Sequence, residues 1–580
     1  MQVLWLLLFL FNFCVLFSTW QSLEANALSY DYTATVECLR SPFKPQYGGG
    51  IIVNPELNYG LTGWTTFGAP KVQHRELNGN KFIVAHGRNQ SYDSVSQNVY
   101  LRKNRHYTFS AWIQLSQGSG HVTAIFKTTS GFKYAGAVIA ESKCWSMLKG
   151  GFTTDESGPV DLYFEAKTPV DVWVDSVSLQ PFTEKQWKSH QDQSTEEARK
   201  AKVRIQAVDK QGNPLPNATI SIKQNRPGFP FGCAINKNIL SNTAYQNWFT
   251  SNPFTVTTFE NEMKWYSNEP SRGHVDYSVA DAMLKFAQQH SIEVRGHNVF
   301  WDDPRYQPSW LNSLSPSEIY KAAKSRVYSI MSRYKEQVIA WDIVNENLHF
   351  NLLESKIGPS ASSIFYCLAH AIDRKSTMFM NEFNTIEDNR DPLSSPARYL
   401  QMLRVIKSFP CNRNLHMGIG LESHFDVPNL PYMRASIDTL AAANLPIWLT
   451  EVDVQSSPNQ ARYLEQILRE AYSHPKVSGI VIWAAWDPKG CYRMCLTDNN
   501  FRNLPTGDVV ESLLHEWGAM KPLLGTTDAD GFFEISLFHG DYHVQIIDHS
   551  TTLSSSSMFP QSLKVAPNHA SESTLLLQLT

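Results

Sequence analysis

Two glutamates, Glu346 and Glu451, stand at the ends of apolar runs, residues 338–346 and 446–451. Runs rich in Ile, Val and Trp are typical of buried strands in a parallel sheet. Barrel enzymes place their catalytic groups at the carboxyl ends of such strands. Two carboxyl groups that meet there are the minimum needed to cleave a glycosidic bond, because one protonates the leaving oxygen while the other attacks carbon or activates water.

The bulk composition is that of a soluble globular protein. The chain has 580 residues, 42% of them hydrophobic and 18% charged, and its length allows two to four domains. The net charge of −3 leaves no basic footprint, so we expect no nucleic-acid partner. Phe, Trp and Tyr make up 12% of the residues. That richness suits sugar binding, although most of these rings are expected in the core.

The N-terminus has the pattern of a secretory signal. Residues 3–17 are almost entirely apolar, and Ala25-Asn26-Ala27 has the small-x-small form of a cleavage site. We expect residues 1–27 to be a signal peptide and the mature protein to be secreted, without a membrane partner. A signal anchor is the alternative, but the run is short for a membrane span. Two acceptor sequons, at Asn89 and Asn217, fit the secretory route.

The cysteines predict disulfides and no metal site. One of the eight, Cys14, lies in the signal, and an odd count of seven implies at least one free thiol or an intermolecular bond. Cys491 and Cys495 are close in a loop and form the disulfide that we expect. No Cys or His spacing matches a metal site, so we predict neither a metal nor another cofactor.

Three β-rich segments surround a central region. Residues 50–182 show short alternating stretches between turn residues, which predicts a β-sandwich or jelly roll. Residues 183–230 hold a polar stretch, a linker or an exposed helix, followed by a strand–turn–strand unit over 202–223. Residues 523–580 show the same strand pattern. Neither piece is large enough for its own core, so we expect the two to pair into one small β-sandwich.

The central region, residues 231–522, alternates strands with helical stretches. One helix is signalled by the capping box Ser315-Pro316-Ser317-Glu318, and a second by the apolar spacing over 459–473. Eight strands predict an α/β fold, a (β/α)8 TIM barrel. The expected strands cover residues 231–234, 254–259, 292–301, 338–346, 377–381, 416–424, 446–454 and 479–486.

This region resembles glycoside hydrolase family 10, the retaining endo-1,4-β-xylanases. Six motifs, each at an expected strand end, occur in the order of the family. They are residues 259–265 (FENEMKW), 295–301 (RGHNVFW), 341–346 (WDIVNE), 420–425 (GLESHF), 449–454 (LTEVDV) and 482–483 (IW).

The resemblance implies a role for each site residue. Glu346 would be the acid/base and Glu451 the nucleophile, with His424 and Asp453 orienting Glu451. Asn345 would bond the sugar 2-hydroxyl. Taken singly, a lone Trp or His is more often a core residue. The remaining residues implied in substrate binding are Glu260, Asn261, Lys264, His297, Trp301, Glu422 and Trp483.

Four positions depart from the family pattern. Asp302 and Pro304 stand where the family has His and Gln, and Glu422 stands where it has Gln. Cys491 occupies the place of a second Trp. These changes leave the glutamate pair intact but are expected to alter the sugar pocket.

Residues 50–182 resemble carbohydrate-binding module family 22 at looser motifs, among them Gly63-Trp64 and residues 163–166 (YFEA). The resemblance implies a xylan-binding cleft; the alternative for each residue is a supporting role in the sandwich. The candidate residues are Arg88, Tyr92, Tyr134 and Glu165. Asn89 lies inside this patch, where a glycan would obstruct binding.

Together these features predict a secreted, monomeric retaining endo-1,4-β-xylanase that acts on cell-wall xylan. One alternative is a xylan endotransglycosylase, in which a sugar hydroxyl replaces water. Another is a wall-binding protein whose barrel has lost activity. Retention of Glu346, Glu451, Asn345, His424 and Asp453 argues against that loss.

Overall fold

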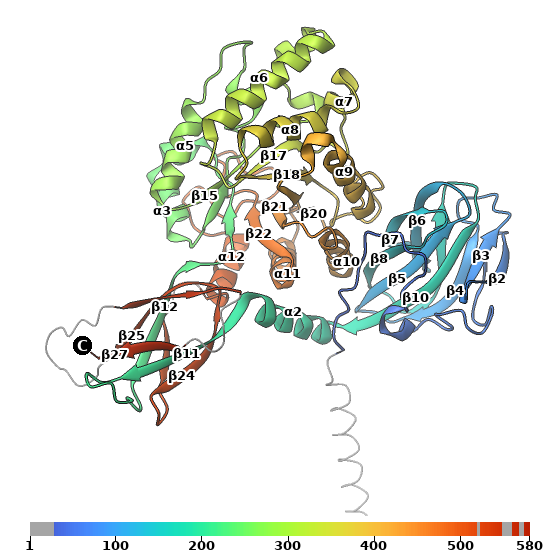
Figure 1. The fold of residues 1–580 in the computed structure, drawn as a ribbon, viewed down its shortest axis with the longest axis horizontal. Coiled ribbons are helices and arrows are strands. Elements are labelled where there is room, and N and C mark those ends of the chain that lie inside the picture. The colour runs from blue at the N-terminus through green and yellow to red at the C-terminus, as the bar shows by residue number, and fades with distance from the viewer. Residues whose placement is uncertain (1–27, 519–521, 548–559, 568–573, 580) are drawn as a thin grey trace, which may run out of the picture.

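The computed structural model describes residues 28–518, 522–547, 560–567 and 574–579. An N-terminal β-sandwich, a central barrel and a small second sandwich are joined by helix α2 (Glu184–Arg199), which runs between the two sandwiches beneath the barrel (Figure 1). The predicted signal peptide, residues 1–27, lies outside the described residues. Among the described residues, no helix is both long and apolar enough to cross a membrane.

The central region is a closed parallel barrel, as predicted. The strand order runs from β13 around to β22, and β22 pairs back with β13, so the sheet has no open edge. The eight strand positions are β13 (Phe231–Cys233), β14 (Val256–Thr258), β15 (Glu293–Gly296) with β16 (Phe300–Trp301), β17 (Ala340–Asn345), β18 (Thr377–Glu382), β19 (Met417–Leu421) with β20 (His424–Phe425), β21 (Ile447–Val454) and β22 (Val477–Ile482).

Helices surround the barrel and bury their apolar faces against it. The capping box predicted at Ser315 is formed, and the Ser315 backbone N–H donates to Glu318 Oε2 at 3.0 Å. The longer helices are α3 (Thr243–Ser251), α5 (Ser278–Gln289), α6 (Pro316–Tyr334), α8 (Ala361–Ile372), α9 (Pro396–Ser408), α10 (Leu430–Ala441), α11 (Gln460–Ser473) and α12 (Pro505–Glu516); the shorter ones are α4 (Trp265–Asn268) and α7 (Leu352–Ile357).

The N-terminal module is a sandwich of two five-stranded antiparallel sheets, which confirms that prediction. Their inward residues form one apolar core, with Phe109, Phe126 and Phe164 at its centre. One sheet has the order β1 (Thr65–Phe67), β4 (Ser94–Leu101), β9 (Gly158–Ala166), β6 (Ser119–Lys127), β7 (Phe132–Glu141). The other has the order β2 (Lys71–Leu77), β3 (Asn80–His86), β10 (Val172–Thr183), β5 (Arg105–Leu115), β8 (Ser146–Thr154).

The second sandwich joins segments about 300 residues apart, so the predicted pairing is confirmed. In Figure 1 the green strands β11 (Lys200–Val208) and β12 (Thr219–Pro227) lie among the red C-terminal strands. β11 pairs with β24 (Phe532–Phe538) and β27 (Thr574–Gln578). β12 pairs with β23 (Leu523–Thr526) and β25 (Gly540–Ile547), which pairs with β26 (Gln561–Val565).

Helix α2 is neither a free linker nor a fully exposed helix. Its Trp187 is buried, and the indole Nε1 donates to Glu470 Oε2 of barrel helix α11 at 2.8 Å. The charged residues that suggested exposure lie on its other side.

Six of the cysteines are paired. The expected Cys491–Cys495 disulfide is present, together with Cys38–Cys144 and Cys367–Cys411. Cys233, on β13, is a free buried thiol and accounts for the odd count.

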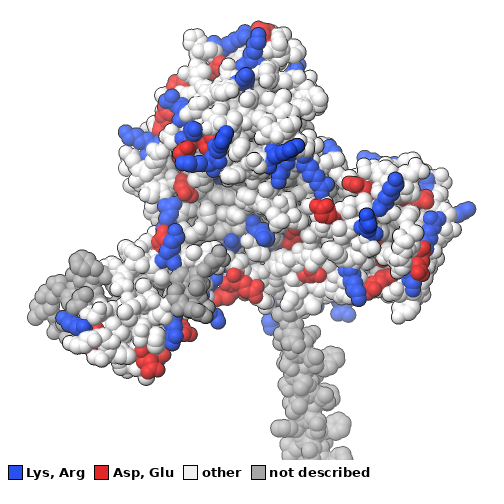
Figure 2. Space-filling view, viewed as in Figure 1, with Lys and Arg blue, Asp and Glu red and all other residues white. Residues whose placement is uncertain are grey.

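Figure 2 shows Lys and Arg interspersed with Asp and Glu on the viewed face of all three units. On this face the described residues form no basic stripe, in agreement with the small net charge.

Candidate active site

The barrel brings Glu346 and Glu451 into one hydrogen-bonded cluster. Asn381, at the end of β18, donates through Nδ2 to Glu451 Oε1 and to Asn345 Oδ1, both at 2.9 Å. Asn345 Nδ2 in turn lies 3.3 Å from Glu346 Oε1. Two amides therefore connect the two carboxyl groups across β17, β18 and β21.

Glu346 is held in a strained conformation and has a raised pKa. It follows β17 with φ of 60°, a region that non-glycine residues seldom adopt and that clusters at functional sites. Burial raises the pKa of Glu346 to about 8, and the negative charges of Glu382 and Glu451 act in the same direction against an opposing bond from Trp301. A carboxyl with this pKa is protonated at neutral pH and can donate a proton.

Glu451, in contrast to Glu346, has a lowered pKa. Burial alone would raise its pKa, but the surrounding His297, His424 and Lys264 outweigh burial and lower the pKa of Glu451 to about 2. His297 Nε2 lies 3.8 Å from Oε1 and His424 Nε2 lies 3.7 Å from Oε2. The group is therefore an anion at any working pH, which is the state that a nucleophile needs.

The Asp453 carboxylate contacts His424 on the ring nitrogen that faces away from Glu451. Its Nδ1 lies 3.0 Å from Asp453 Oδ2, and Asp453 also accepts a bond from Arg493 Nε at 2.8 Å. Asp453 raises the pKa of His424 well above its usual value, more than offsetting burial. The ring therefore carries a positive charge beside Glu451.

Glu422, the residue that departs from the family pattern, is inside the cluster. Its Oε2 lies 3.4 Å from His424 Nε2, and its Oε1 accepts from Asn381 Nδ2 at 3.2 Å. Burial, followed by the charges of Glu451 and Glu346, raises the pKa of Glu422 well above its usual value. A protonated carboxyl has the same shape as the amide of Gln, which explains how the pocket accommodates the change.

Aromatic rings and one lysine line the space beside the two glutamates. Lys264 is buried, and its Nζ lies 4.4 Å from the Trp301 ring centre and 5.7 Å from that of Trp483. His297 meets the Trp483 ring edge-to-face at 5.5 Å. Burial lowers the pKa of Lys264, opposed by the charges of Glu451 and Glu346. Rings beside charged donors suit a sugar ring, which presents an apolar face and a hydroxyl edge.

The two remaining residues implied in substrate binding, Glu260 and Asn261, lie at different depths. Glu260 accepts from Asn236 Nδ2 at 3.1 Å, and burial raises the pKa of Glu260 to about 7. Asn261 is exposed at the rim, where its Oδ1 accepts from Tyr266 at 2.7 Å. All the predicted barrel residues thus lie at the carboxyl end of the barrel.

Of the other three departures, only Asp302 differs from the expectation that it alters the sugar pocket. Asp302 faces away from the sugar space, because its Oδ1 accepts from the Leu353 backbone of α7 at 2.9 Å. Burial raises the pKa of Asp302 to about 8. Pro304 begins a short turn that places Tyr306 flat against Trp301 at 4.1 Å. Cys491 lies in the loop disulfide.

Sequence reasoning missed several residues of the site. Asn381 ends a predicted strand, so the strand-end rule that selected the glutamates would also have found it. Glu382 is fully buried and contacts His349 Nδ1 at 2.7 Å, and His349 Nε2 contacts Asp391 at 2.9 Å. His349 and Asp391 lie in loops without a pattern that would have indicated them.

The candidate binding residues of the N-terminal module differ in their surroundings. Arg88 was expected to bond sugar hydroxyls, but its guanidinium donates to five backbone carbonyls, of Ser91, Asp93, Ala166, Thr168 and Val170. No N–H is left for a ligand, so the expectation for Arg88 is wrong and its role is to hold the loop. Tyr92 is 41% exposed, and Glu165 accepts from Ser91 at 3.1 Å. Asn89 and Asn217 are exposed, as acceptor sites must be.

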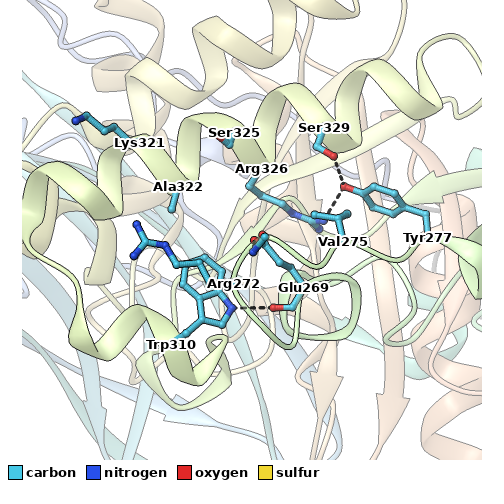
Figure 3. Close-up of a pocket in the computed structure, with 11 residues that line it drawn as sticks. Glu269, Arg272, Val275, Tyr277, Trp310, Lys321, Ala322, Ser325, Arg326 and Ser329 are labelled. Atoms are coloured by element: carbon cyan, nitrogen blue, oxygen red, sulfur yellow. Dashed lines mark hydrogen bonds between the residues drawn. The ribbon is translucent and has the colours of Figure 1, made fainter.

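A cavity of about 330 Å³ lies apart from this cluster, between α6 and the loop that contains Glu269 (Figure 3). Trp310 Nε1 donates to the Glu269 carbonyl at 2.9 Å. Arg326, at its back, donates to Asn268 and to the carbonyls of Met263 and Asn298. These bonds hold the loop after β14, so Arg326 is a structural residue.

Residues 221–503 match the profile of glycosyl hydrolase family 10, and residues 49–173 match that of a carbohydrate-binding domain. Endo-1,4-beta-xylanase 5 of Arabidopsis thaliana is 43% identical over 79% of this chain and 82% of its own length. The chain belongs to glycosyl hydrolase family 10. A second relative, Endo-1,4-beta-xylanase 5-like of Arabidopsis thaliana, is 38% identical over 92% of this chain and 93% of its own length.

Solved family 10 structures are also similar. The CBM22-1–GH10 modules of Clostridium thermocellum Xyn10B, complexed with xylohexaose, cover 80% of this chain and 98% of that one, at 16% identity and a TM-score of 0.41. This family 10 chain is a glycoside hydrolase with a carbohydrate-binding domain.

Proposed function

We propose that the protein is a retaining endo-1,4-β-xylanase that hydrolyses internal bonds of cell-wall xylan. The observation that carries the proposal is the pair of opposed pKa values in one cluster, about 8 at Glu346 and about 2 at Glu451. When the surroundings of two neighbouring carboxyl groups raise one pKa and lower the other, the group with the raised pKa is assigned as the acid and the other as the nucleophile. The names of the relatives in Arabidopsis supply the substrate.

In the first step, Glu346 gives its proton to the glycosidic oxygen while Glu451 attacks the anomeric carbon. The carbon–oxygen bond breaks, the leaving chain departs with the proton, and a glycosyl ester forms on Glu451. In the second step, the Glu346 carboxylate takes a proton from water, and the water oxygen displaces Glu451. After the two steps Glu346 is protonated and Glu451 is ionised again, as at the start.

The other residues orient the reactants. His424 and Asp453 fix the attacking oxygen of Glu451, and Asn345 bonds the sugar 2-hydroxyl. Glu260, Asn261 and Lys264 hold the sugars on the non-reducing side of the cut. His297 and Trp301 line the subsite of the reacting sugar, and Trp483 stacks beneath that sugar. Glu422 also belongs to the substrate-binding set. The proposal places two carboxyl groups about 5–5.5 Å apart, the separation that retention requires.

We further propose a secreted, glycosylated monomer that acts in the cell wall. The apolar segment at residues 3–17 and the exposed Asn89 and Asn217 support this route. Its partner is the xylan polysaccharide.

Release of reducing ends from glucuronoxylan tests the proposal, with Glu346→Gln and Glu451→Gln as variants. The parent should be active, and each variant should lose about 10²–10⁴-fold or more of the rate. Analysis of product chain lengths separates hydrolysis, which only shortens chains, from transglycosylation, which also lengthens them. A parent that binds xylan without cleaving it would refute the proposal.

A further inference from the structure

The N-terminal module is fixed to the barrel by buried polar contacts. Lys149 of β8 and Asp438 of α10 form an ion pair of 2.8 Å, with side chains 2% and 0% exposed. Asn429 donates to the Gly151 carbonyl at 3.2 Å, and a Cβ on Gly151 would come within 2.6 Å of Pro431. Moving the module away from the barrel would leave a buried charge without its partner, which is strongly unfavourable, so these contacts favour the observed orientation.

Two other segments close the same joint. Tyr30, from the segment before the module, donates to Asp438 at 2.7 Å. From α2, His190 lies 2.7 Å from Arg434, and Arg434 also pairs with Glu470. A module that only delivered the enzyme to its substrate would need no such fixed orientation.

The outer face of the β1–β4–β9–β6–β7 sheet carries rings and a carboxylate. Phe67 stacks on Tyr163 at 4.0 Å, and Tyr92 meets Phe67 edge-on at 6.2 Å. Glu165 lies two residues after Tyr163 on β9, so it shares that face. Tyr134 of β7 also points outward, because Ala135 beside it is in the sandwich core. We call these five residues the ring face.

The ring face ends at the rim of the active site. β7 is the edge strand, and the Asn389 side chain, in the loop after β18, donates to the Tyr134 carbonyl. In the same loop Glu387 accepts from the backbone N–H of His424 at 3.1 Å, and Asp391 contacts His349. One loop therefore contacts the module on one side and supports the glutamate cluster on the other.

The position of this loop also indicates which end of a bound xylan chain would reach the module. Glu260 and Lys264, proposed to hold sugars on the non-reducing side of the cut, follow β14. The module contacts the loops after β18 and β20, on the other side of the barrel opening. The ring face thus lies on the side from which the leaving chain departs.

We propose that the ring face and the barrel cleft form one continuous binding surface for a single β-1,4-xylan chain, with the module holding its leaving-group portion. The inference rests on the proposed xylanase function. Cleavage efficiency then increases with the length of chain on the reducing side, beyond what the barrel alone contacts.

The test measures kcat/KM on soluble linear xylo-oligosaccharides of increasing length and on an aryl β-xylobioside. The variants are Tyr92→Ala and Tyr134→Ala, with Leu77→Ala as the control, since Leu77 is 53% exposed on the opposite sheet. Loss of a stacking ring should lower kcat/KM about tenfold on the longest chains. The aryl xylobioside, which ends inside the barrel, should be cleaved equally by all four proteins.

A label at the reducing end checks the direction. In the parent, long labelled fragments should dominate, and Tyr134→Ala should reduce their share. Equal kcat/KM for parent and variants at every chain length, with weaker binding to insoluble xylan, would overturn the inference and leave an independent targeting module. A parent that cleaves neither xylan nor the aryl substrate would instead defeat the proposed function itself.

Discussion

At the scale of single residues, the chemistry depends on environment rather than on residue type. Glu346, Glu422 and Glu451 are three buried carboxyl groups in one cluster. Burial raises the pKa of Glu346 and of Glu422, and only at Glu451 do the neighbouring His297, His424 and Lys264 outweigh burial and lower the pKa. Their differences follow from which neighbours each one faces.

The pKa values predict the pH dependence of cleavage. Glu346 must be protonated for the first step, so kcat/KM on xylan should fall as pH rises through about 8. Glu451 stays ionised down to a pH of about 2 and should not limit the acidic side. An aryl xylobioside with a good leaving group needs no proton, and its first step should lack the alkaline loss. Identical alkaline limbs for both substrates would contradict the role of Glu346.

Glu422→Gln should change stability in a pH-dependent way. The pKa of Glu422 is raised in the folded protein, so above its unfolded pKa the unfolded chain releases the proton first and stability falls as pH rises. The Gln variant removes this penalty, and its melting temperature should exceed that of the parent at pH 7.5. At pH 4 the two should melt alike. A constant difference at both pH values would show that packing, not titration, is responsible.

At the scale of elements, strand ends position the site and buried ion pairs join the units. Burial would raise the pKa of Asp438, but Lys149 and His474 lower it to about 2. The pair Lys149–Asp438 therefore stabilises the protein above the unfolded pKa of Asp438, and this contribution is lost as pH falls through about 2.

Asp438→Asn should weaken the joint between β8 and α10. Removing one partner leaves a buried charge unpaired, at a cost of about 3–5 kcal/mol. We expect a clearly lower melting temperature at pH 6. The control is Asp155→Asn, whose pair with Lys133 is exposed and contributes about 0–1 kcal/mol. Equal melting temperatures for the two variants would indicate that the joint is not held by this ion pair.

At the scale of the whole molecule, much was predictable from the sequence. The eight barrel strands, both sandwiches and the Cys491–Cys495 disulfide follow from periodicity, turns and spacing. The roles of Arg88, Asp302 and α2 do not, because each depends on partners distant in sequence that no local pattern indicates. The ion pair between Lys149 and Asp438 could not be predicted from the sequence for the same reason.

The small sandwich makes the segment before the barrel and the C-terminal segment depend on each other for folding. Removing residues 523–580 should leave β11 and β12 with unpaired edges and expose Val203, Ile205 and Ile220, which are buried in the complete sandwich. We expect aggregation by size-exclusion chromatography. A chain that ends at residue 573 loses only edge strand β27 and should remain largely monodisperse. A soluble, monodisperse 1–522 fragment would contradict this interdependence.

The most direct test of the retaining mechanism is to trap the glycosyl ester with an activated 2-deoxy-2-fluoro-β-xylobioside and to locate it by mass spectrometry. We expect one added 2-deoxy-2-fluoroxylobiosyl group, on the peptide that contains Glu451, and no adduct in Glu451→Gln. An adduct on any other residue, or none in an enzyme that still cleaves xylan, would contradict the assignment of Glu451 as the nucleophile and with it the retaining mechanism.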